Sequence, residues 1–368
     1  MSVSRGYLSS LDNWLRRVGV GEVLCGRYCV RLEREVAWKL VILSASMSQK
    51  IRGSRAVLFG LLGFLLGGCA QADRTLSIAT GGPAGLYYPF GGGMASVWSA
   101  QLADVNVKAE VTGGSITNVT QVARLESDLG IAMADVTTDA YLGEGLFNTP
   151  LPLRVLFTAY PNIVHILTLE GSGITSVADL RGKRVAMGAQ GSGTAVAAAN
   201  TLRGLGVQID TIAPRYLNFA ATTAALKDGT VDAGFIVGGL GIAAVTELAV
   251  TRPLRLISLK AEELEQLVSH YPAYSGYQIP AATYNGVNSA TTALGIWSAV
   301  VVHASMPSEL AFRLTCTVYQ QRQALLQISP VVQAMTLENI HRLPAVPLHA
   351  GTQQYLQDPT QDCGGAGE

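Results

Sequence analysis

Hydrophobic runs of strand length alternate with segments of helical period from residue 74 onward. The run TLSIAT, at 75–80, is followed by the glycine-rich stretch GGPAGLYYPFGGG and then by the helical segment MASVWSAQLA. Short aliphatic runs that end at glycine turns indicate strands, whereas apolar positions three or four residues apart indicate helices. Because this unit recurs along the chain, the sequence predicts parallel sheets that carry helices on both faces.

The predicted elements extend to residue 343. Strands are expected at 75–80, 105–111, 128–135, 184–189, 213–219, 231–239 and 253–259. Helices are expected at 94–103, 116–127, 136–145, 176–180, 194–206, 220–229, 241–250 and 261–272. The apolar run 292–306 is expected to bring the chain back before two late helical segments, at 308–327 and 329–343.

This series predicts two α/β lobes, the first of which is built partly from the C-terminal third of the chain. The expected boundaries are 74–162 for the first part of lobe 1, 163–260 for lobe 2, 261–350 for the return to lobe 1 and the C-terminal helices, and 351–368 for a flexible tail. Two or three strands are expected to cross between the lobes. Ligands of open α/β sheets bind beyond the carboxyl ends of strands, so the cleft between the lobes is the predicted ligand site.

A secretory signal peptide is expected at 47–68. Lys50, Arg52 and Arg55 form a basic segment, and no charged residue follows until the end of the apolar run at Gly68. A basic segment, a short apolar segment and small residues at the cut are the order of a signal peptide. The apolar run is too short to span a bilayer comfortably.

The residues around the cut, LGGC at 66–69, resemble the lipobox of bacterial lipoproteins, in which the cysteine becomes the first mature residue. In a lipobox the cysteine thiol receives a diacylglycerol, so Cys69 is the expected lipidation site and the anchor to the membrane surface. An ordinary cleaved signal with an incidental cysteine and a short buried helix are the alternatives. Residues 1–46 precede this signal and fit no compact domain, so we expect them to be a disordered or non-native upstream extension.

The charge balance changes when the leader is set aside. The chain has 26 basic and 26 acidic residues, of which residues 1–68 carry 10 and 4, leaving 16 and 22 in the remainder. A mildly acidic body argues against nucleic acid as a partner, because phosphates require a basic face. About 300 residues are enough for two domains with cores of their own.

Two cysteines follow Cys69 in the chain. Cys316 stands in the apolar stretch AFRLTCTVY, and Cys363 stands in the polar tail QDCGGAGE. The two would be able to pair in an oxidising compartment. Their different surroundings instead favour a buried free thiol at Cys316 and an unpaired cysteine in a loose tail at Cys363.

Four predicted strands end in glycine-rich turns that lead into helices: TGGPAGLYYPFGGG, TGGSITN, GAQGSGT and GGLGIAA. The start of a helix offers unpaired N–H groups and partial positive charge, and glycine lets a ligand approach the backbone closely. The phosphate-loop motif GxxxxGK[ST] is absent, and GAQGSG does not have the spacing of dinucleotide-binding loops. Several such turns around one cleft would hold a small anion, whereas each turn alone is more often a plain tight turn.

The polar candidates share a position at a strand end or in the first turn of a helix, and they are Tyr87, Tyr88, Ser115, Asn118, Asp135, Ser192 and Thr194. Tyr87 and Tyr88 are consecutive, so one is expected to pack while the other faces a ligand. The serine, asparagine and threonine side chains either cap their helices or contact an anion. Asp135 either caps the following helix, which we favour, or accepts from a ligand ammonium group.

No catalytic constellation is present in the sequence. The five histidines are scattered, without an HExxH motif or a cysteine partner, so neither a metal site nor a cofactor is expected. No GxSxG motif surrounds Ser115 or Ser192. His165 lies in an apolar strand and is expected to be structural. A hydrolase or transferase that uses one of these serines would need a base from a distant position, so we expect that the protein is not an enzyme.

Taken in order, these stretches resemble the TAXI family, the solute receptors of TRAP transporters. The resemblance is carried by LSIATGGPAGLYYPFGGGMA, by EVTGGSITNVTQVARLESDLGIAMADVTTDAYLGEG and by SVADLRGKRVAMGAQGSGT. It continues through LKDGTVDAGFIVGG, IPAATYNG and the helix at 307–327, and so covers about residues 75–335.

The resemblance implies a type II periplasmic-binding-protein fold, in which two α/β lobes close on a small ligand. It implies a monomeric, lipid-anchored periplasmic receptor that delivers a carboxylate or amino acid, such as glutamate or glutamine, to a sodium-driven TRAP permease. By motif position, the implied ligand-binding residues are Thr80, Gly81, Gly82, Tyr87, Tyr88, Ser115, Asn118, Asp135, Gly191, Ser192, Gly193 and Thr194.

The chain departs from the family pattern at two places. It has Ala134 where the family often has serine before the aspartate, and it lacks a proline after the glycines of GGLGIAA. We expect the missing hydroxyl to alter ligand choice and the missing proline to loosen the rim of the cleft at the GGLGIAA turn. The alternative function is a sensor, in which the closed lobes signal to a membrane receptor or kinase instead of serving a permease.

Overall fold

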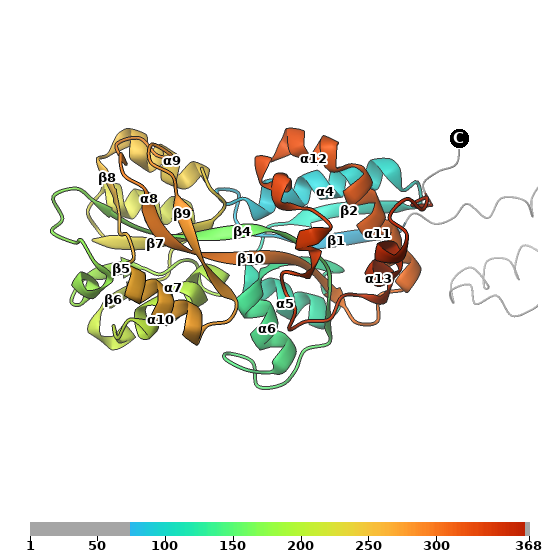
Figure 1. Cartoon of the computed structure of the whole chain (residues 1–368), viewed down its shortest axis with the longest axis horizontal. Coiled ribbons are helices and arrows are strands. Elements are labelled where there is room, and N and C mark those ends of the chain that lie inside the picture. Colours follow the sequence, from blue (N-terminus) through green and yellow to red (C-terminus); the bar gives the residue numbers. More distant parts are fainter. Residues whose placement is uncertain (1–73, 365–368) are drawn as a thin grey trace, which may run out of the picture. The chain divides into compact units, whose positions relative to one another are not determined.

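The computed structural model describes residues 74–364, which belong to one compact unit, Gln71–Glu368. The predicted upstream extension, signal peptide and Cys69 lie outside the described residues. Figure 1 shows two lobes joined by the long strands β4 (Leu153–Leu169) and β10 (Thr291–His303). No helix within the described residues has the length and apolar character needed to cross a bilayer.

The first lobe combines early and late parts of the chain. Its strands are β1 (Arg74–Ala79), β2 (Val105–Glu110) and β3 (Leu129–Met133). Its helices are α4 (Tyr87–Gln101), α5 (Ser115–Ala123), α6 (Ala134–Leu142), α11 (Ser308–Gln320), α12 (Arg322–Ile328) and α13 (Ala350–Gln357), with 3-10 turns η3 (Pro330–Ala334) and η4 (Glu338–His341).

The second lobe is built from the middle of the chain. Its strands are β5 (Arg184–Ala186), β6 (Ala213–Arg215), β7 (Ala233–Gly238), β8 (Leu254–Leu256) and β9 (Tyr274–Ile279). Its helices are α7 (Gly193–Gly204), α8 (Phe219–Lys227), α9 (Ala243–Thr251) and α10 (Ala261–His270), with 3-10 turns η1 (Val177–Leu180) and η2 (Ile209–Thr211).

One path of hydrogen-bonded strands runs through both lobes, in the order β2-β1-β3-β10-β4-β7-β5-β6. Pairs within a lobe, such as β1 with β2 and β5 with β6, are parallel, whereas β10 is antiparallel to both β3 and β4. The last residues of β10 pair with the first residues of β4, and the first residues of β10 pair with β9. Two strands therefore cross between the lobes, and the predicted two-lobed α/β fold is confirmed.

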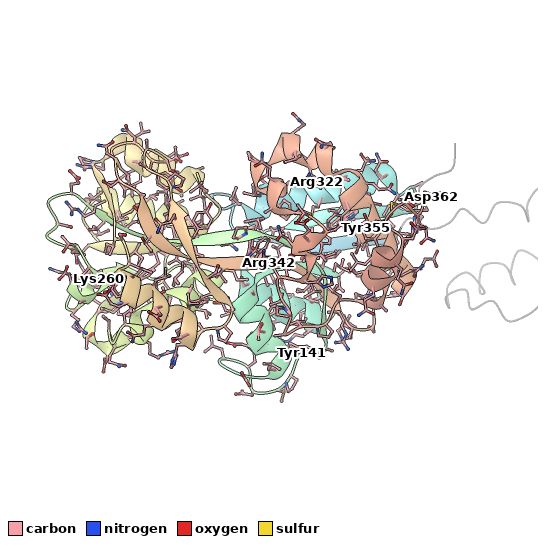
Figure 2. All side chains as sticks on the ribbon, in the orientation of Figure 1. Tyr141, Lys260, Arg322, Arg342, Tyr355 and Asp362 are labelled. Atoms are coloured by element: carbon pink, nitrogen blue, oxygen red, sulfur yellow. A yellow bond between two sulfur atoms is a disulfide. The ribbon has the colours of Figure 1, made fainter. Side chains whose placement is uncertain are left out.

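Each lobe buries an apolar core of its own. In the first lobe Trp98 is fully buried, and its indole N–H donates to the Leu314 carbonyl at 2.8 Å, which ties α4 to α11. In the second lobe α9 packs on β7 through side chains that include Val245 and Ile236. Between the lobes, the Arg342 guanidinium lies 5.6 Å from the centre of the Trp297 ring on β10, and Figure 2 labels Arg342 near the middle of the molecule.

The chain returns to the first lobe later than the predicted boundary at 261. Helix α10 packs on α7 in the second lobe, where a Cβ placed on Gly204 would lie 2.6 Å from the Leu267 side chain. Strand β9, for which the sequence analysis predicted no element, adds to the edge of β10. The return takes place along β10 itself, because this strand is long enough to span both lobes.

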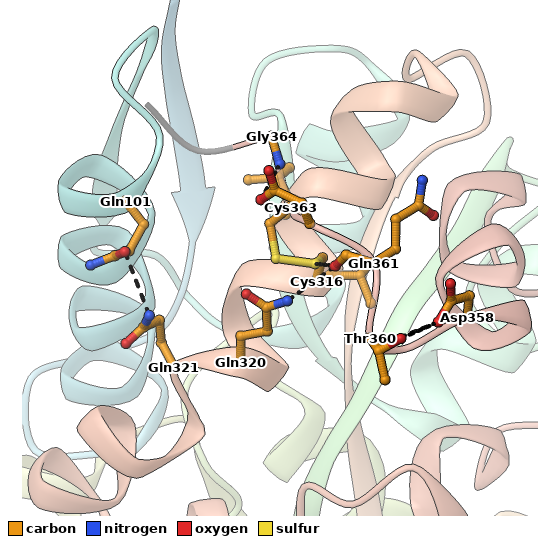
Figure 3. The surroundings of a disulfide bond; sticks show 12 residues. Gln101, Cys316, Gln320, Gln321, Asp358, Thr360, Gln361, Cys363 and Gly364 are labelled. Atoms are coloured by element: carbon orange, nitrogen blue, oxygen red, sulfur yellow. Dashed lines mark hydrogen bonds between the residues drawn. A yellow bond between two sulfur atoms is a disulfide. The ribbon is translucent and has the colours of Figure 1, made fainter. Parts of the chain in front are cut away.

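The C-terminal segment differs from the predicted flexible tail and unpaired cysteines. Helix α13 packs closely on α11, so that a Cβ on Gly351 would lie 2.1 Å from the Ser308 carbonyl oxygen. Beyond α13 the chain folds back over α11, and Cys363 forms a disulfide with Cys316, as Figure 3 shows. Both sulfur-bearing residues are buried in a cluster with aromatic side chains. The sequence around Cys363 gave no sign of this contact, because its apolar partners, Phe312 and Tyr319 on α11 and Tyr355 on α13, are distant along the chain or lie in the preceding helix.

Loss of this disulfide is expected to lower the free energy of unfolding. The bond closes a segment of 47 residues, and the loss of chain entropy in the unfolded state gives a stabilisation of about 4 kcal/mol. The midpoint of urea unfolding should therefore fall for Cys363→Ser, and dithiothreitol should lower the midpoint of the native chain but not that of the variant. Equal midpoints for the native chain with and without reductant would contradict the pairing.

Candidate functional site

A cavity of about 380 Å³ lies between the lobes, at the carboxyl ends of parallel strands from both. Its volume falls in the range of small-molecule sites. The cavity is lined by Gly81, Gly82, Pro83, Ala84, Gly85, Leu86, Tyr87, Val111, Thr112, Gly113, Gly114, Ser115, Met133, Asn162, Ala189, Ser192, Gly193, Thr194, Asn218, Phe219, Ala220, Val237 and Gly238.

Four helices begin at this cavity, two from each lobe. Helices α4 and α5 come from the first lobe, and α7 and α8 come from the second. Seven residues at the starts of these helices line the cavity and have backbone N–H groups with no acceptor among the described residues, namely Leu86, Tyr87, Ser115, Gly193, Thr194, Phe219 and Ala220. Such groups, together with the helix dipoles, form a binding site for an anion.

Hydrogen-bonded side chains on the crossing strands β4 and β10 lie at the floor of the cavity. The Asn162 amide donates to the Ser298 hydroxyl and to the Ile296 carbonyl, and so joins β4 to β10. The Tyr87 hydroxyl lies 3.0 Å from the Ser298 hydroxyl. Burial raises the pKa of Tyr87 to about 12, so the hydroxyl keeps its proton and remains a donor at neutral pH.

The lobes contact each other directly beside the cavity. The Gly191 carbonyl, from the second lobe, accepts hydrogen bonds from the N–H groups of Ile116 and Thr117 in α5 at 3.1 and 3.3 Å. Glycines on both sides make this approach possible. A Cβ on Gly193 would lie 2.6 Å from the Met133 sulfur and 2.6 Å from the Ser115 hydroxyl oxygen, so a larger residue there would force the lobes apart.

A second contact between the lobes centres on Asp135, in the first turn of α6. Its carboxylate accepts from the Val136 N–H at 2.8 Å and from the Tyr274 hydroxyl at 3.0 Å. The Tyr274 oxygen in turn accepts from the Asn200 amide of α7 at 3.0 Å. Burial raises the pKa of Asp135 to about 6. The expectation that Asp135 caps this helix is wrong, because Asp135 lies inside α6, after the N-cap residue Met133, and no side chain within the described residues caps the helix.

The structure brings seven of the twelve predicted site residues to the cavity: Gly81, Gly82, Tyr87, Ser115, Ser192, Gly193 and Thr194. Of the consecutive tyrosines, Tyr87 lines the cavity, while Tyr88 is 37% exposed and lies outside it. The Ser192 hydroxyl also caps α7 by accepting from the Ala195 N–H at 3.1 Å. Contact of these seven residues with a ligand remains a prediction.

The other four predicted residues are not at the cavity surface. Thr80 and Asn118 are buried behind it, where the Asn118 amide donates to the Thr80 carbonyl at 2.6 Å. Asp135 and Gly191 serve the contacts between the lobes. The turn GGLGIAA also differs from expectation, because only Gly238 at its start lines the cavity. Helix α8 begins at the cavity in place of α9.

Three polar residues at the cavity were not predicted: Thr112, Asn162 and Asn218. The Thr112 hydroxyl bonds to the Thr80 carbonyl, to the Asn118 side-chain oxygen and to the Gly114 N–H. Asn218 caps α8 by accepting from the Ala221 N–H at 2.9 Å, and an asparagine before a helical segment is a recognisable cap signal. Asn162 lies in the middle of β4, where a polar residue inside an apolar run was the available signal. His165, expected to be structural, is buried in β4 with its Nε2 2.8 Å from the Tyr284 hydroxyl.

Neither an acidic, a basic nor a histidine side chain is among the described residues that line the cavity. Within residues 74–364, the His, Cys, Asp and Glu side chains form no group of three that could hold a metal ion. The hydroxyls of Ser115 and Ser192 therefore have no general base beside them in this part of the chain. The chemistry of the cavity is that of donor groups and apolar surface.

The chain has the fold of periplasmic solute-binding proteins. Residues 78–358 match the model of the NMT1-like family, and the chain belongs to that family. The predicted two-lobed fold is confirmed, whereas the TAXI assignment remains a prediction.

Solved structures with a similar fold share little sequence with this chain. MatC from Rhodopseudomonas palustris with bound malate is 13% identical, over 78% of this chain and 97% of MatC, with a TM-score of 0.51. PhnD1 from Prochlorococcus marinus in complex with methylphosphonate is 15% identical over 77% and 99%, with a TM-score of 0.48. The aliphatic sulphonate binding protein SsuA from Escherichia coli is 17% identical over 75% and 84%, with a TM-score of 0.41.

The raised pKa of Asp135 predicts a pH dependence of stability. The pKa is about 6 in the folded chain and about 3.9 in an unfolded one. The folded state therefore favours the protonated carboxyl, so the contribution of Asp135 is fully present below about pH 4 and is lost as the pH rises through 6. Relative to Asp135→Asn, the native chain should lose up to about 3 kcal/mol of unfolding free energy between pH 4 and pH 7.

Urea unfolding at each pH measures this difference. Asp210→Asn, at an exposed position, is the matched control and should show no such trend relative to the native chain. A difference between the native chain and Asp135→Asn that stays constant across this range would contradict the assignment.

Proposed function

We propose that the protein is an extracytoplasmic solute receptor that binds a small carboxylate or amino acid between its lobes. The observation that supports this most strongly is the set of seven unpaired N–H groups, from four helices and both lobes, around one cavity. A carboxylate bound there would accept from both lobes at once. Closed lobes would then be stabilised by the ligand, because it binds the closed form better than the open one.

Closure requires that the lobes move without loss of the fold. Strands β4 and β10 carry the chain across, while the contacts of Gly191 with α5 and of Asp135 with Tyr274 form only when the lobes meet. The ligand would be covered by the Tyr87 ring on one side and by Phe219 on the other. Binding of this kind needs no catalytic group, in agreement with the uncharged lining.

For the cellular role, we propose delivery of the solute to a sodium-driven TRAP permease. The support is the resemblance to TAXI receptors in the glycine turns that surround the cavity. The proposal includes a periplasmic location and a monomeric state. It also includes a lipid anchor on Cys69, and this anchor is proposed from the LGGC sequence.

A thermal-shift screen tests the binding function directly. A ligand present at a hundred times its dissociation constant adds about 2.7 kcal/mol to the free energy of unfolding, so the melting temperature should rise measurably. The panel should contain malate, 2-oxoglutarate, glutamate, glutamine and 4-methyl-2-oxopentanoate at millimolar concentration. Failure of every carboxylate and amino acid to raise the melting temperature would overturn the proposal.

The variant Gly193→Ala tests whether binding depends on closure. The added Cβ would meet Met133 and Ser115 of the opposite lobe, and such overpacking costs about 1–3 kcal/mol. Calorimetry with a ligand from the screen should therefore give an affinity about 5- to 150-fold weaker, with little change in melting temperature without ligand. Gly92→Ala is the matched control, since a Cβ at Gly92 meets nothing within 4 Å. Equal affinities for the two variants would contradict the closure mechanism.

A further inference from the structure

The cavity contains many hydrogen-bond donors and few free side-chain acceptors. Besides the seven N–H groups, the Asn218 side chain presents its amide N–H₂, because its oxygen is bonded to the Ala221 N–H. Thr194 is 96% buried, lines the cavity and makes no side-chain hydrogen bond with any described residue. The Thr194 hydroxyl oxygen is not enclosed by protein atoms, so it is available to bond a polar atom of a ligand in the cavity.

The side-chain acceptors at the cavity are mostly occupied by the protein itself. The Ser192 hydroxyl accepts from the Ala195 N–H and donates to the Ala189 carbonyl. The Ser115 hydroxyl oxygen accepts from the Met133 N–H at 3.1 Å. Among the described lining residues, the Asn162 side-chain oxygen is a remaining neutral acceptor, which suits a hydroxyl group of a ligand better than a full positive charge.

An ammonium group would have no counter-charge in this cavity. Burial of an ammonium ion is costly unless an anionic partner is present, and the described lining includes neither aspartate nor glutamate. The carboxylate of Asp135 lies behind this lining and is bonded to the Val136 N–H and the Tyr274 hydroxyl. The remaining surface is apolar, with Leu86 and Val237 on opposite lobes.

We infer that the cavity selects carboxylates that carry no ammonium group: oxo, hydroxy or unsubstituted acids with an apolar body, in preference to the amino acids of the same skeleton. This inference rests on the proposed receptor function and narrows its ligand class. The donors from four helices bind the carboxylate, the Asn162 oxygen accepts from a hydroxyl where the ligand has one, and the apolar surface covers the carbon chain.

Matched acids test the inference on the purified full-length chain. Calorimetry should compare 4-methyl-2-oxopentanoate and 4-methylpentanoate with leucine, and 2-oxoglutarate with glutamate. We expect each amino acid to bind at least about a hundredfold more weakly than its ammonium-free partner, because a buried unpaired charge costs several kcal/mol. Equal or tighter binding of the amino acids would overturn the inference and leave the receptor function intact. Absence of binding by all five compounds would instead overturn the receptor function.

The variant Asn218→Asp places a carboxylate at the rim of the cavity while keeping an oxygen that caps α8. We expect the ratio of amino-acid to oxo-acid affinity to rise at least about tenfold, since aspartate supplies the missing partner for an ammonium group. Asn106→Asp, at an exposed position on β2, adds the same charge elsewhere and should leave the ratio unchanged. The same ratio in both variants would count against the inference.

Discussion

The unpaired N–H groups in the first turns of α4, α5, α7 and α8 are the constraint that organises the centre of this protein. Each buried donor needs an acceptor, and the two lobes supply acceptors for only some of these N–H groups. Helix α5 directs two of its groups to the Gly191 carbonyl of the other lobe, and the Ser192 and Asn218 side chains cap α7 and α8. The donors that are left belong to residues that line one cavity from both sides. Some N–H groups at these helix starts therefore join the lobes at the rim, and under the proposed function the others would bind the ligand inside.

The crossing strands explain how this arrangement opens and closes. Both β4 and β10 continue through the boundary between the lobes, and the bonds of Asn162 to Ser298 and Ile296 hold them together at that point. The Tyr87 hydroxyl reaches the same group from α4. A rotation of one lobe against the other bends these strands and leaves the pairing inside each lobe unchanged. The cavity floor thus lies on the strands that join the lobes, and under the proposed function a ligand that contacts the floor would act on this hinge directly.

Much of the fold could be predicted, because strand, glycine turn and helix have local sequence patterns. The starts of α5 and α7 were recognisable from glycine and serine at the turns, and Ser115 and Gly193 were accordingly identified. The features that were predicted wrongly depend on contacts between residues that are distant in sequence. The roles of Asn118 and Asp135 depend on residues distant in sequence, since Asn118 bonds to Thr80 and Asp135 to Tyr274. Pairing of Cys316 with Cys363 likewise follows from packing of the tail on α11, which no local pattern encodes.

The split construction of the first lobe has a consequence for the order in which the chain folds. Its sheet begins at residue 74, yet α11, α13 and the disulfide to Cys363 come from the end of the chain. The second lobe is continuous in sequence, and all its strands are present once β10 has been synthesised. During translation the second lobe can therefore fold before the last helices of the first lobe have been synthesised. Premature termination near residue 305 would leave a folded second lobe attached to an incomplete first lobe.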